Sequence, residues 1–232
     1  MDAREVLGIL DLTLLDHDAS ESELEIFCNN ANKHKPYSVC VFSKHVEFVR
    51  KRLDDGISIA AVVGGFPVGW QDKVTLRNAL EGAVISGADE IDCVLEPRGT
   101  EDFPSEEDLA LLSIMREGAT GCKLKVIIEA PLLSEHSIRA VSRMALAAGA
   151  DFVKSCTGRR GTCSDEHATI LAMEVKRHQV VMGEERGLKL SGGIRVMDDV
   201  IRLMTIVRKQ DEGIFGPLRI RIGASSLLDE IV

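Results

Sequence analysis

Short apolar runs alternate with amphipathic stretches along almost the whole chain. The apolar runs are rich in Val and Ile, and most are continuous rather than broken by a polar residue at every second position. Continuous runs of this kind are typical of parallel strands that are covered on both faces. They predict eight strands, at residues 6–15, 37–42, 57–65, 90–96, 123–130, 151–156, 187–192 and 219–224.

The amphipathic stretches between these runs predict helices with clear start signals. Each stretch follows a residue whose side chain can accept hydrogen bonds from the first free backbone N–H groups of a helix. Glycines stand where three of the helices should end, at Gly87, Gly118 and Gly149. The expected cap residues are Ser20, Asp72, Ser105, Ser134 and Ser164, and a last helix is expected to begin near Ser225.

Eight strands with helices between them indicate an α/β protein with a (β/α)8 (TIM) barrel. An open, doubly wound sheet is the competing architecture. It is disfavoured because eight units fit a closed barrel and no G-x-G-x-x-G motif follows the first strand. No Pro- or Ser-rich linker divides the chain, so we expect a single domain over residues 1–232. At most about two turns remain for the eighth helix, which we expect to be short or truncated.

Composition and charge narrow the class of protein. With 232 residues, 45% of them apolar, the chain can bury one large core. A net charge of −9 argues against nucleic acid and anionic membranes as partners, whereas a local cluster of donors suffices for a phosphorylated small molecule. No apolar run is long enough to span a membrane, and the first residues do not resemble a signal peptide. The six cysteines form no C-x-x-C pair, so we expect reduced, buried thiols and a cytoplasmic protein.

Chemistry in such a barrel belongs at the carboxyl ends of the strands. Two lysines are the strongest candidates there: Lys154 in DFVKSC and Lys189 in GLKLSG. Burial and mutual repulsion of two ammonium groups both favour losing one proton, which gives a neutral amine able to form a Schiff base with a carbonyl. A lysine that merely reaches solvent from a strand end, or one paired with Asp92, is the alternative. The other polar candidates at strand ends are Asp11, Thr13, Cys40 and Asp92.

The acidic candidates each allow two interpretations. Asp92 lies two residues after Glu90, so both side chains should face the same side of the strand. Asp92 could shuttle protons or serve as counter-ion to a lysine, and these roles are compatible. Asp11 could bind a substrate hydroxyl, although tying down the loop after the first strand is the favoured interpretation. Cys40, between two valines, is more typical of a small buried apolar residue than of a nucleophile.

Glycine-bearing loops after the last strands predict a phosphate site. GGIR (192–195) follows the seventh strand and GASS (223–226) follows the eighth, where barrels frequently bind phosphate. A third loop, CTGRRG (156–161), adds glycine and two arginines. The histidines show neither H-x-x-x-H nor H-E-x-x-H spacing, so no metal site is predicted.

Motifs along nearly the whole chain resemble those of the deoxyribose-phosphate aldolase family. The motifs are DLTLL (11–15), VCVF (39–42), GGFPVG (64–69), ADEIDCVL (88–95), KVIIEAPLL (125–133), GADFVKSCTG (149–158), GLKLSGGIR (187–195) and RIGASSLL (221–228). The resemblance implies reversible cleavage of 2-deoxy-D-ribose 5-phosphate to D-glyceraldehyde 3-phosphate and acetaldehyde, in deoxyribose phosphate catabolism. It implies no metal or organic cofactor, because an imine on the protein serves as electron sink, and it suggests a homodimer.

The resemblance also implies roles for individual residues. Lys154 would form the imine, Lys189 would be the second lysine that favours the neutral amine, and Asp92 would move protons. The remaining implied positions bind substrate: the phosphate pocket at Gly158, Gly192, Gly193, Gly223, Ser225 and Ser226, and the sugar near Asp11, Thr13, Cys40 and Thr157. Two alternatives stay open, namely a lysine-dependent barrel aldolase for a different sugar phosphate and a non-catalytic barrel that binds sugar phosphates.

Overall fold

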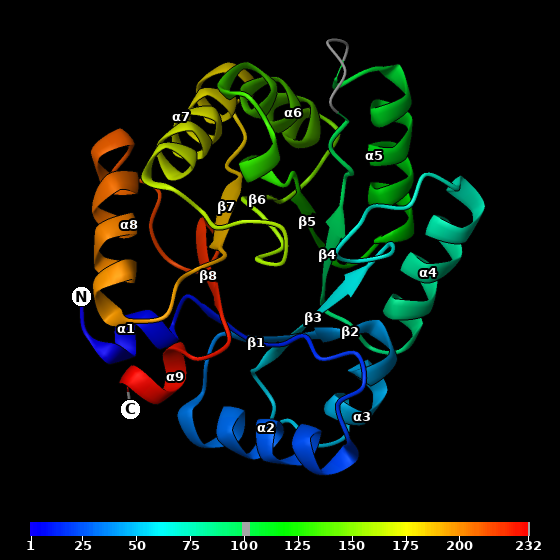
Figure 1. Cartoon of the computed structure of the whole chain (residues 1–232), viewed down its shortest axis with the longest axis vertical. Coiled ribbons are helices and arrows are strands. Elements are labelled where there is room, and N and C mark those ends of the chain that lie inside the picture. Colours follow the sequence, from blue (N-terminus) through cyan, green and yellow to red (C-terminus); the bar gives the residue numbers. More distant parts are fainter. Residues whose placement is uncertain (99–102, 232) are drawn as a thin grey trace.

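A computed structural model describes residues 1–98 and 103–231 of the chain. Eight parallel strands pair in sequence order, and β8 pairs with β1 to close the barrel (Figure 1). The strands are β1 (Leu10–Leu14), β2 (Ser38–Phe42), β3 (Ser58–Val63), β4 (Glu90–Val94), β5 (Lys123–Ile127), β6 (Phe152–Lys154), β7 (Gly187–Ser191) and β8 (Ile220–Ala224). The predicted (β/α)8 barrel is therefore confirmed.

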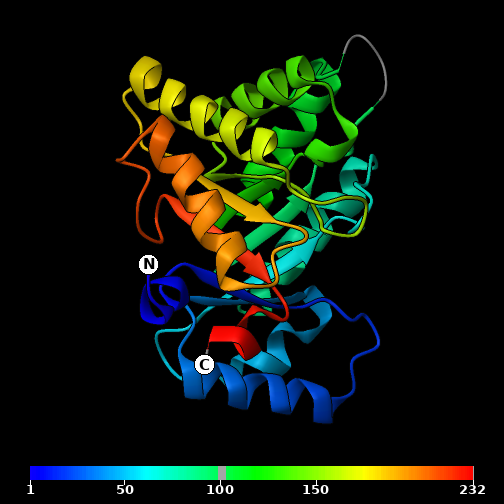
Figure 2. The same cartoon turned by 60° about the vertical axis from the view of Figure 1, so that its left-hand side comes forward.

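Helices surround the barrel in both views (Figures 1 and 2). They are α1 (Ala3–Leu7), α2 (Glu21–His34), α3 (Val46–Arg50), α4 (Lys73–Ile85), α5 (Glu106–Gly118), α6 (Glu135–Ala147), α7 (Asp165–Met182), α8 (Met197–Gln210) and α9 (Leu227–Ile231). Short 3-10 turns lie at Ser43–His45 and Ala130–Leu132. In both figures α1 and α9 lie near each other, since the first and last strands are neighbours.

The main apolar core lies between the barrel wall and the helices. Successive residues of a strand point to opposite faces, and β4 shows the consequence. Ile91 and Cys93 belong to the core packed against the helices, whereas Glu90 and Asp92 point into the barrel and meet Lys125. The strands are buried on both faces, which explains their nearly continuous apolar sequences.

The first predicted strand, residues 6–15, is wrong at its start. Val6 and Leu7 belong to α1, and the strand begins only at Leu10. The side chain of Asp2 accepts the backbone N–H of Glu5, and the side chain of Glu5 accepts that of Asp2. This reciprocal cap stabilises a helix of a single turn. Val6 is fully buried, so its apolar character fits a helix as well as a strand.

Most helix starts agree with the prediction. Five helices begin directly after Ser20, Asp72, Ser105, Ser134 and Ser164. The expected short final helix is α9. Three helices, α1, α3 and α8, were not predicted. Val196, which precedes α8, has no side-chain oxygen, and the cap comes instead from within the helix, where Asp199 Oδ2 accepts the N–H groups of Arg195 and Val196.

Across residues 1–98 and 103–231, none of the helices is both sufficiently long and sufficiently apolar to traverse a lipid bilayer.

Candidate active site

A pocket of about 250 Å³ opens at the carboxyl ends of the strands, where the loops after β1, β6, β7 and β8 meet. Most of the residues expected to bind substrate lie on its surface. Those that line it are Thr13, Lys154, Thr157, Gly158, Gly192, Gly193, Gly223, Ser225 and Ser226. The structure therefore brings together residues from four strand ends that are far apart in sequence.

Close packing of the loops after β6 and β7 explains why glycine occupies this part of the pocket. Gly192 has φ +92°, and a Cβ atom there would lie 2.6 Å from Cys156 Sγ. Gly158 has φ +73°, and its Cβ would lie 3.2 Å from the Cα of Gly192. L-residues with side chains rarely adopt such φ values. A side chain at Gly192 would therefore collide with the loop after β6, so glycine allows the two loops to pack closely at the pocket.

Two exposed arginines also line the pocket, Arg159 and Arg195. The guanidinium of Arg159 donates a hydrogen bond to the carbonyl of Leu15, 2.5 Å away, and so links the loops after β6 and β1. Arg159 belongs to the loop CTGRRG, which was included in the phosphate site predicted from the sequence, whereas Arg195 was not singled out. Their charges make this end of the barrel locally basic in a protein of net charge −9, which favours an anionic ligand.

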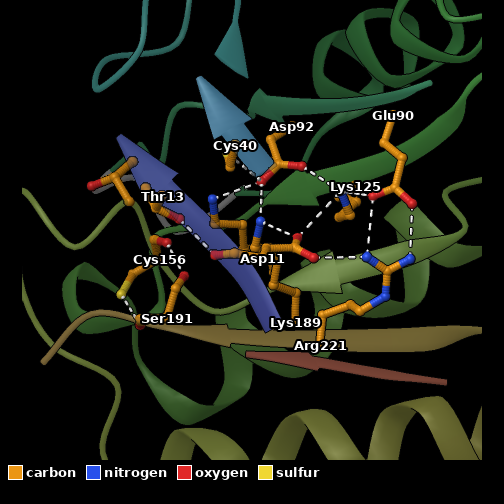
Figure 3. Close-up of polar contacts among 12 residues, drawn as sticks. Asp11, Thr13, Cys40, Glu90, Asp92, Lys125, Cys156, Lys189, Ser191 and Arg221 are labelled. Atoms are coloured by element: carbon orange, nitrogen blue, oxygen red, sulfur yellow. Dashed lines mark hydrogen bonds and ion pairs between the residues drawn. The ribbon is translucent and has the colours of Figure 1, made fainter. Parts of the chain in front are cut away.

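Beneath the pocket, Asp92 is the centre of a buried network of charged groups (Figure 3). Its Oδ2 accepts hydrogen bonds from the Nζ atoms of Lys154 and Lys189, both at 2.8 Å. Its Oδ1 accepts one from Nζ of Lys125, also at 2.8 Å. Lys154 is the member of this trio that also lines the pocket. Its amine therefore joins the pocket to the network.

Two further carboxylates complete the network. Asp11 Oδ2 lies 2.5 Å from Nζ of Lys189, and its Oδ1 lies 2.7 Å from Nη1 of Arg221. Glu90 contacts Lys125 at 2.5 Å and Nη2 of Arg221 at 2.8 Å. All of these side chains have almost no exposed surface. Ion pairs in such surroundings persist only when hydrogen bonds and opposite charges compensate for the lost hydration.

The network holds Asp92 and Lys189 in their charged forms. Burial alone would raise the pKa of Asp92, but Lys125, Lys154 and Lys189 outweigh burial and hold that pKa well below its usual range. Burial would likewise lower the pKa of Lys189, yet Asp11 and Asp92 raise it well above the ordinary value. For Lys125, burial again opposes the charge, but Asp92, Glu90 and Asp11 raise its pKa above the ordinary value.

These surroundings correct the expected picture of two lysines that simply repel each other. The two lysines share one oxygen of Asp92, and Lys189 has Asp11 as a second counter-ion. Lys189 therefore keeps its proton. The salt bridge to Asp92, the alternative interpretation of the sequence, is present for both lysines.

Asp11 and Cys40 lie below the pocket rather than on its surface. Asp11 is fully buried and accepts a hydrogen bond from Ser38 Oγ at 2.6 Å in addition to its two ion pairs. The favoured interpretation, that Asp11 ties down the loop after β1, is therefore wrong: the side-chain contacts of Asp11 are with the buried network. Cys40 packs in a small apolar cluster with Ala60, Val62, Phe66, Val94 and Ile127, as expected for a buried thiol.

Sequence reasoning missed Lys125, Arg221 and Ser38 as members of the network. A signal was present for the first two. Lys125 stands between Leu124 and Val126, and Arg221 stands between Ile220 and Ile222. A charged residue flanked by apolar neighbours in a barrel strand points inward when its neighbours face the helices. Ser38 gives no comparable signal.

The fold and this site define the class of protein as a (β/α)8 enzyme with a buried lysine cluster below a pocket lined by glycines, serines and arginines. A family profile described as DeoC/LacD family aldolase matches residues 6–229. The chain is 32% identical over 196 residues to deoxyribose-phosphate aldolase 2 of Staphylococcus aureus (strain COL), covering 84% of this chain and 86% of that protein. The chain belongs to the DeoC/LacD family of aldolases.

Solved structures share the fold. An aldolase named QR15 is 26% identical, with a TM-score of 0.80 over 97% of this chain and 95% of that one. The deoxyribose phosphate aldolase of Aeropyrum pernix, described as a tetramer, shares the fold at 23% identity, with a TM-score of 0.80 over 99% of this chain and 90% of that one.

Proposed function

We propose that this aldolase reversibly cleaves 2-deoxy-D-ribose 5-phosphate to D-glyceraldehyde 3-phosphate and acetaldehyde through an imine on Lys154. The observation that carries the proposal is the position of Lys154. Of the three lysines around Asp92, only Lys154 lines the described pocket, while Lys125 and Lys189 lie beneath it. A carbonyl carbon in the pocket can reach its amine without entering the charged layer below.

The reaction requires one neutral amine and an electron sink. The Nζ of Lys154 attacks C1 of the open-chain sugar, and loss of water gives the protonated imine. Removal of the proton from the C3 hydroxyl breaks the C2–C3 bond, whose electron pair passes to the imine and forms an enamine. Glyceraldehyde 3-phosphate leaves, C2 takes up a proton, and water hydrolyses the imine to release acetaldehyde and the free amine.

Asp92 and Lys189 hold the reacting nitrogen in place in this scheme. Asp92 accepts hydrogen bonds from Lys154 and Lys189 with the same oxygen, so the two amines are neighbours. Asp11 and Asp92 keep Lys189 positively charged beside the reacting amine. The low pKa of Asp92 makes the resting carboxylate a weak base. When the nitrogen of Lys154 becomes a neutral enamine or carbinolamine, one cation is lost beside Asp92, and its affinity for protons rises. Asp92 would exchange protons at those steps.

Glycine and serine residues supply the proposed phosphate contacts. Gly192, Gly193, Ser225 and Ser226 line the pocket. Their backbone N–H groups and serine hydroxyls are the donors that we propose for the phosphate. Arg195 and Arg159 add positive charge at the same place. We propose that the phosphate binds here, with the sugar extending towards Lys154.

Reductive trapping tests the proposed function. Wild-type protein is incubated with acetaldehyde and borohydride, digested and analysed by mass spectrometry. We expect an N-ethyl group on Lys154, none in Lys154→Leu, and normal labelling in Lys176→Leu, which removes an exposed lysine from α7. Lys154→Leu should also lower cleavage of deoxyribose 5-phosphate by several orders of magnitude while the protein stays folded.

Other outcomes would contradict specific parts of the proposal. An adduct on Lys189 would exchange the roles of the two lysines. Absence of any adduct, together with tight binding of phosphorylated ligands, would indicate a non-catalytic barrel. An adduct on Lys154 with faster cleavage of a ketose phosphate than of deoxyribose 5-phosphate would assign a different substrate.

A further inference from the structure

Arg221 and Glu90 form a buried ion pair that lies outside the pocket. Nη2 of Arg221 is 2.8 Å from Glu90 Oε1, and both side chains are almost completely enclosed. The guanidinium carbon lies 3.8 Å from the centre of the Tyr37 ring, and Nε donates to the carbonyl of Pro217. Neither charged residue lines the pocket where substrate would bind. Burying two charges costs free energy, which here is offset by the ion pair itself and by the hydrogen bond to Pro217.

The pair connects to the reacting amine along two short paths. Glu90 contacts Lys125 at 2.5 Å, and Arg221 contacts Asp11 at 2.7 Å (Figure 3). Asp11 contacts Lys189. Lys125 and Lys189 both donate to Asp92, the carboxylate that accepts from Lys154. The pair is therefore part of one continuous array of buried charges.

The charges of this array balance only if one cation gives up its proton. Three carboxylates, those of Asp11, Glu90 and Asp92, face four cationic side chains: Lys125, Lys154, Lys189 and Arg221. An uncompensated charge is unfavourable where water is scarce. Arg221 cannot lose its proton at any ordinary pH, and Lys125 and Lys189 each contact at least two carboxylates. Lys154 contacts one described carboxylate and is the surplus cation.

Other groups that face Lys154 do not alter this balance. Burial raises the pKa of the Cys40 thiol on β2 and raises that of Cys156, after β6, to about 11, so both are neutral at physiological pH. The inward residues of β3 are Ala60 and Val62. Glu129, after β5, is buried but accepts the backbone N–H of Thr157 at 3.2 Å, outside the array.

We infer that the Arg221–Glu90 pair sets the charge of Lys154 from beneath the pocket, and that both are positioning residues for imine formation. The inference rests on the proposed function. If the inference is right, removing the charge of Arg221 and removing the charge of Glu90 must shift the pH dependence of imine formation in opposite directions. A merely structural ion pair would not produce opposite shifts. Without the charge of Arg221, three carboxylates face three lysines, so the charges balance when Lys154 is protonated. We therefore expect Lys154 to keep its proton to higher pH. Loss of the Glu90 charge leaves an excess of cations, so Lys154 gives up its proton at lower pH.

The experiment measures how the rate of imine trapping depends on pH. Acetaldehyde and cyanoborohydride, which withstands mildly acidic solutions, are used with adduct counted on Lys154 by mass spectrometry. We expect the acid side of the profile to move up by about one pH unit in Arg221→Met, which slows trapping about tenfold on that side. In Glu90→Gln it should move down by a similar amount. The double variant, which removes both charges, should return to the wild-type profile.

Matched variants separate charge from packing. Arg221→Lys keeps the charge and should keep the wild-type profile. Arg219→Met removes another buried arginine two residues away, whose guanidinium contacts Gln179 and Glu185 on the outer side of the barrel, and should leave the profile unchanged. Circular dichroism establishes that each variant is folded. If Arg221→Met does not fold, Glu90→Gln and the double variant decide the matter.

Failure of the inference differs from failure of the proposed function. Wild-type protein that yields no Lys154 adduct refutes the function. Wild-type protein that is labelled, with variants whose profiles shift in the same direction or stay in place, refutes the role of the pair. A fixed profile in Glu90→Gln would refute it as well, because another group, such as Lys125, would then take up the change in charge.

Discussion

The three lysines of the barrel differ in how many carboxylates each ammonium group contacts. Lys125 lies within 3.5 Å of Asp11, Glu90 and Asp92. Lys189 contacts Asp11 and Asp92, and Lys154 contacts only Asp92 among the described residues. Each contacting carboxylate stabilises the charged amine, and burial opposes it. Among the described residues, Lys154 therefore has the fewest counter-charges of the three lysines.

Gly192 offers a test of the pocket wall at the scale of a single residue. In Gly192→Ala the new Cβ would meet Cys156 Sγ at 2.6 Å, and φ of +92° is unfavourable for alanine. The loop must therefore shift from its present position at the pocket. We expect KM for deoxyribose 5-phosphate to rise about tenfold, whereas the rate of trapping with acetaldehyde, which lacks phosphate, should stay close to wild type.

Gly183→Ala is the matched control for that substitution. Gly183 ends α7 with φ +72°, and a Cβ atom added there would meet no other atom within 4 Å. The two variants share the backbone strain, which costs about 1–2 kcal/mol, but only Gly192→Ala adds a collision at the pocket. Equal KM values in the two variants would show that the wall after β7 does not contact the phosphate.

At the scale of elements, the start of α8 links helix stability to the pocket. Asp199 accepts the N–H groups of Arg195, at 3.0 Å, and Val196, at 3.4 Å. Asp199→Ala should cost about 1 kcal/mol of stability and raise KM for the phosphorylated sugar a few-fold, because Arg195 lines the pocket. Urea unfolding and steady-state kinetics measure the two effects.

Asp198→Ala controls for charge in the same turn. Asp198 is exposed and lies in the first turn of α8, so its removal weakens the favourable interaction of acidic residues with the helix N-terminus. It leaves the hydrogen bonds of Asp199 in place. A KM increase of the same size in both variants would trace the effect to charge rather than to the position of Arg195.

The elements themselves could largely be predicted from sequence, for physical reasons. Parallel strands covered on both faces give long apolar runs, and Ser or Asp before a helix gives a visible start. The prediction failed where those signals were ambiguous or absent. The apolar Val6 fits a helix and a strand equally, and Val196 lacks an oxygen, because Asp199 caps α8 from inside the helix.

The residues that line the pocket, and Asp11, Asp92 and Lys189 beneath it, could be predicted from the sequence, but the ion pairs that join them to Arg221 and Glu90 could not. Glycine and serine loops after late strands reveal the pocket, because their positions follow from strand order. The pairing of Arg221 with Asp11 and Glu90 joins strands β8, β1 and β4 across the barrel interior. Contacts across the interior depend on strand tilt and register, which the pattern of apolar residues leaves undetermined.

At the scale of the whole molecule, the buried carboxylates make stability depend on pH. Burial would raise the pKa of Asp11, but Lys189, Lys125 and Arg221 hold it well below its ordinary value, and Asp92 behaves similarly. Their folded pKa values lie below the unfolded values of about 4. The stability they contribute is therefore complete above about pH 5 and is lost as pH falls below about 4, where the unfolded chain binds more protons.

Urea unfolding at a series of pH values measures this dependence. We expect the free energy of unfolding to fall by about 1.4 kcal/mol per pH unit for each such carboxylate below about pH 4. Added salt should change the slope little, because buried pairs are poorly screened. A slope that disappears in 1 M salt (a Debye length of about 3 Å) would assign acid sensitivity to surface pairs instead.

The order of the strands along the chain has a consequence for synthesis on the ribosome. Asp11 and Glu90 are translated early, whereas Arg221, their shared guanidinium partner, emerges with the last strand. Until then, closing the nascent sheet would enclose acidic groups without that counter-charge, which is unfavourable. Closing the barrel over Asp11 and Glu90 therefore becomes more favourable once β8 has been translated and Arg221 can pair with both carboxylates.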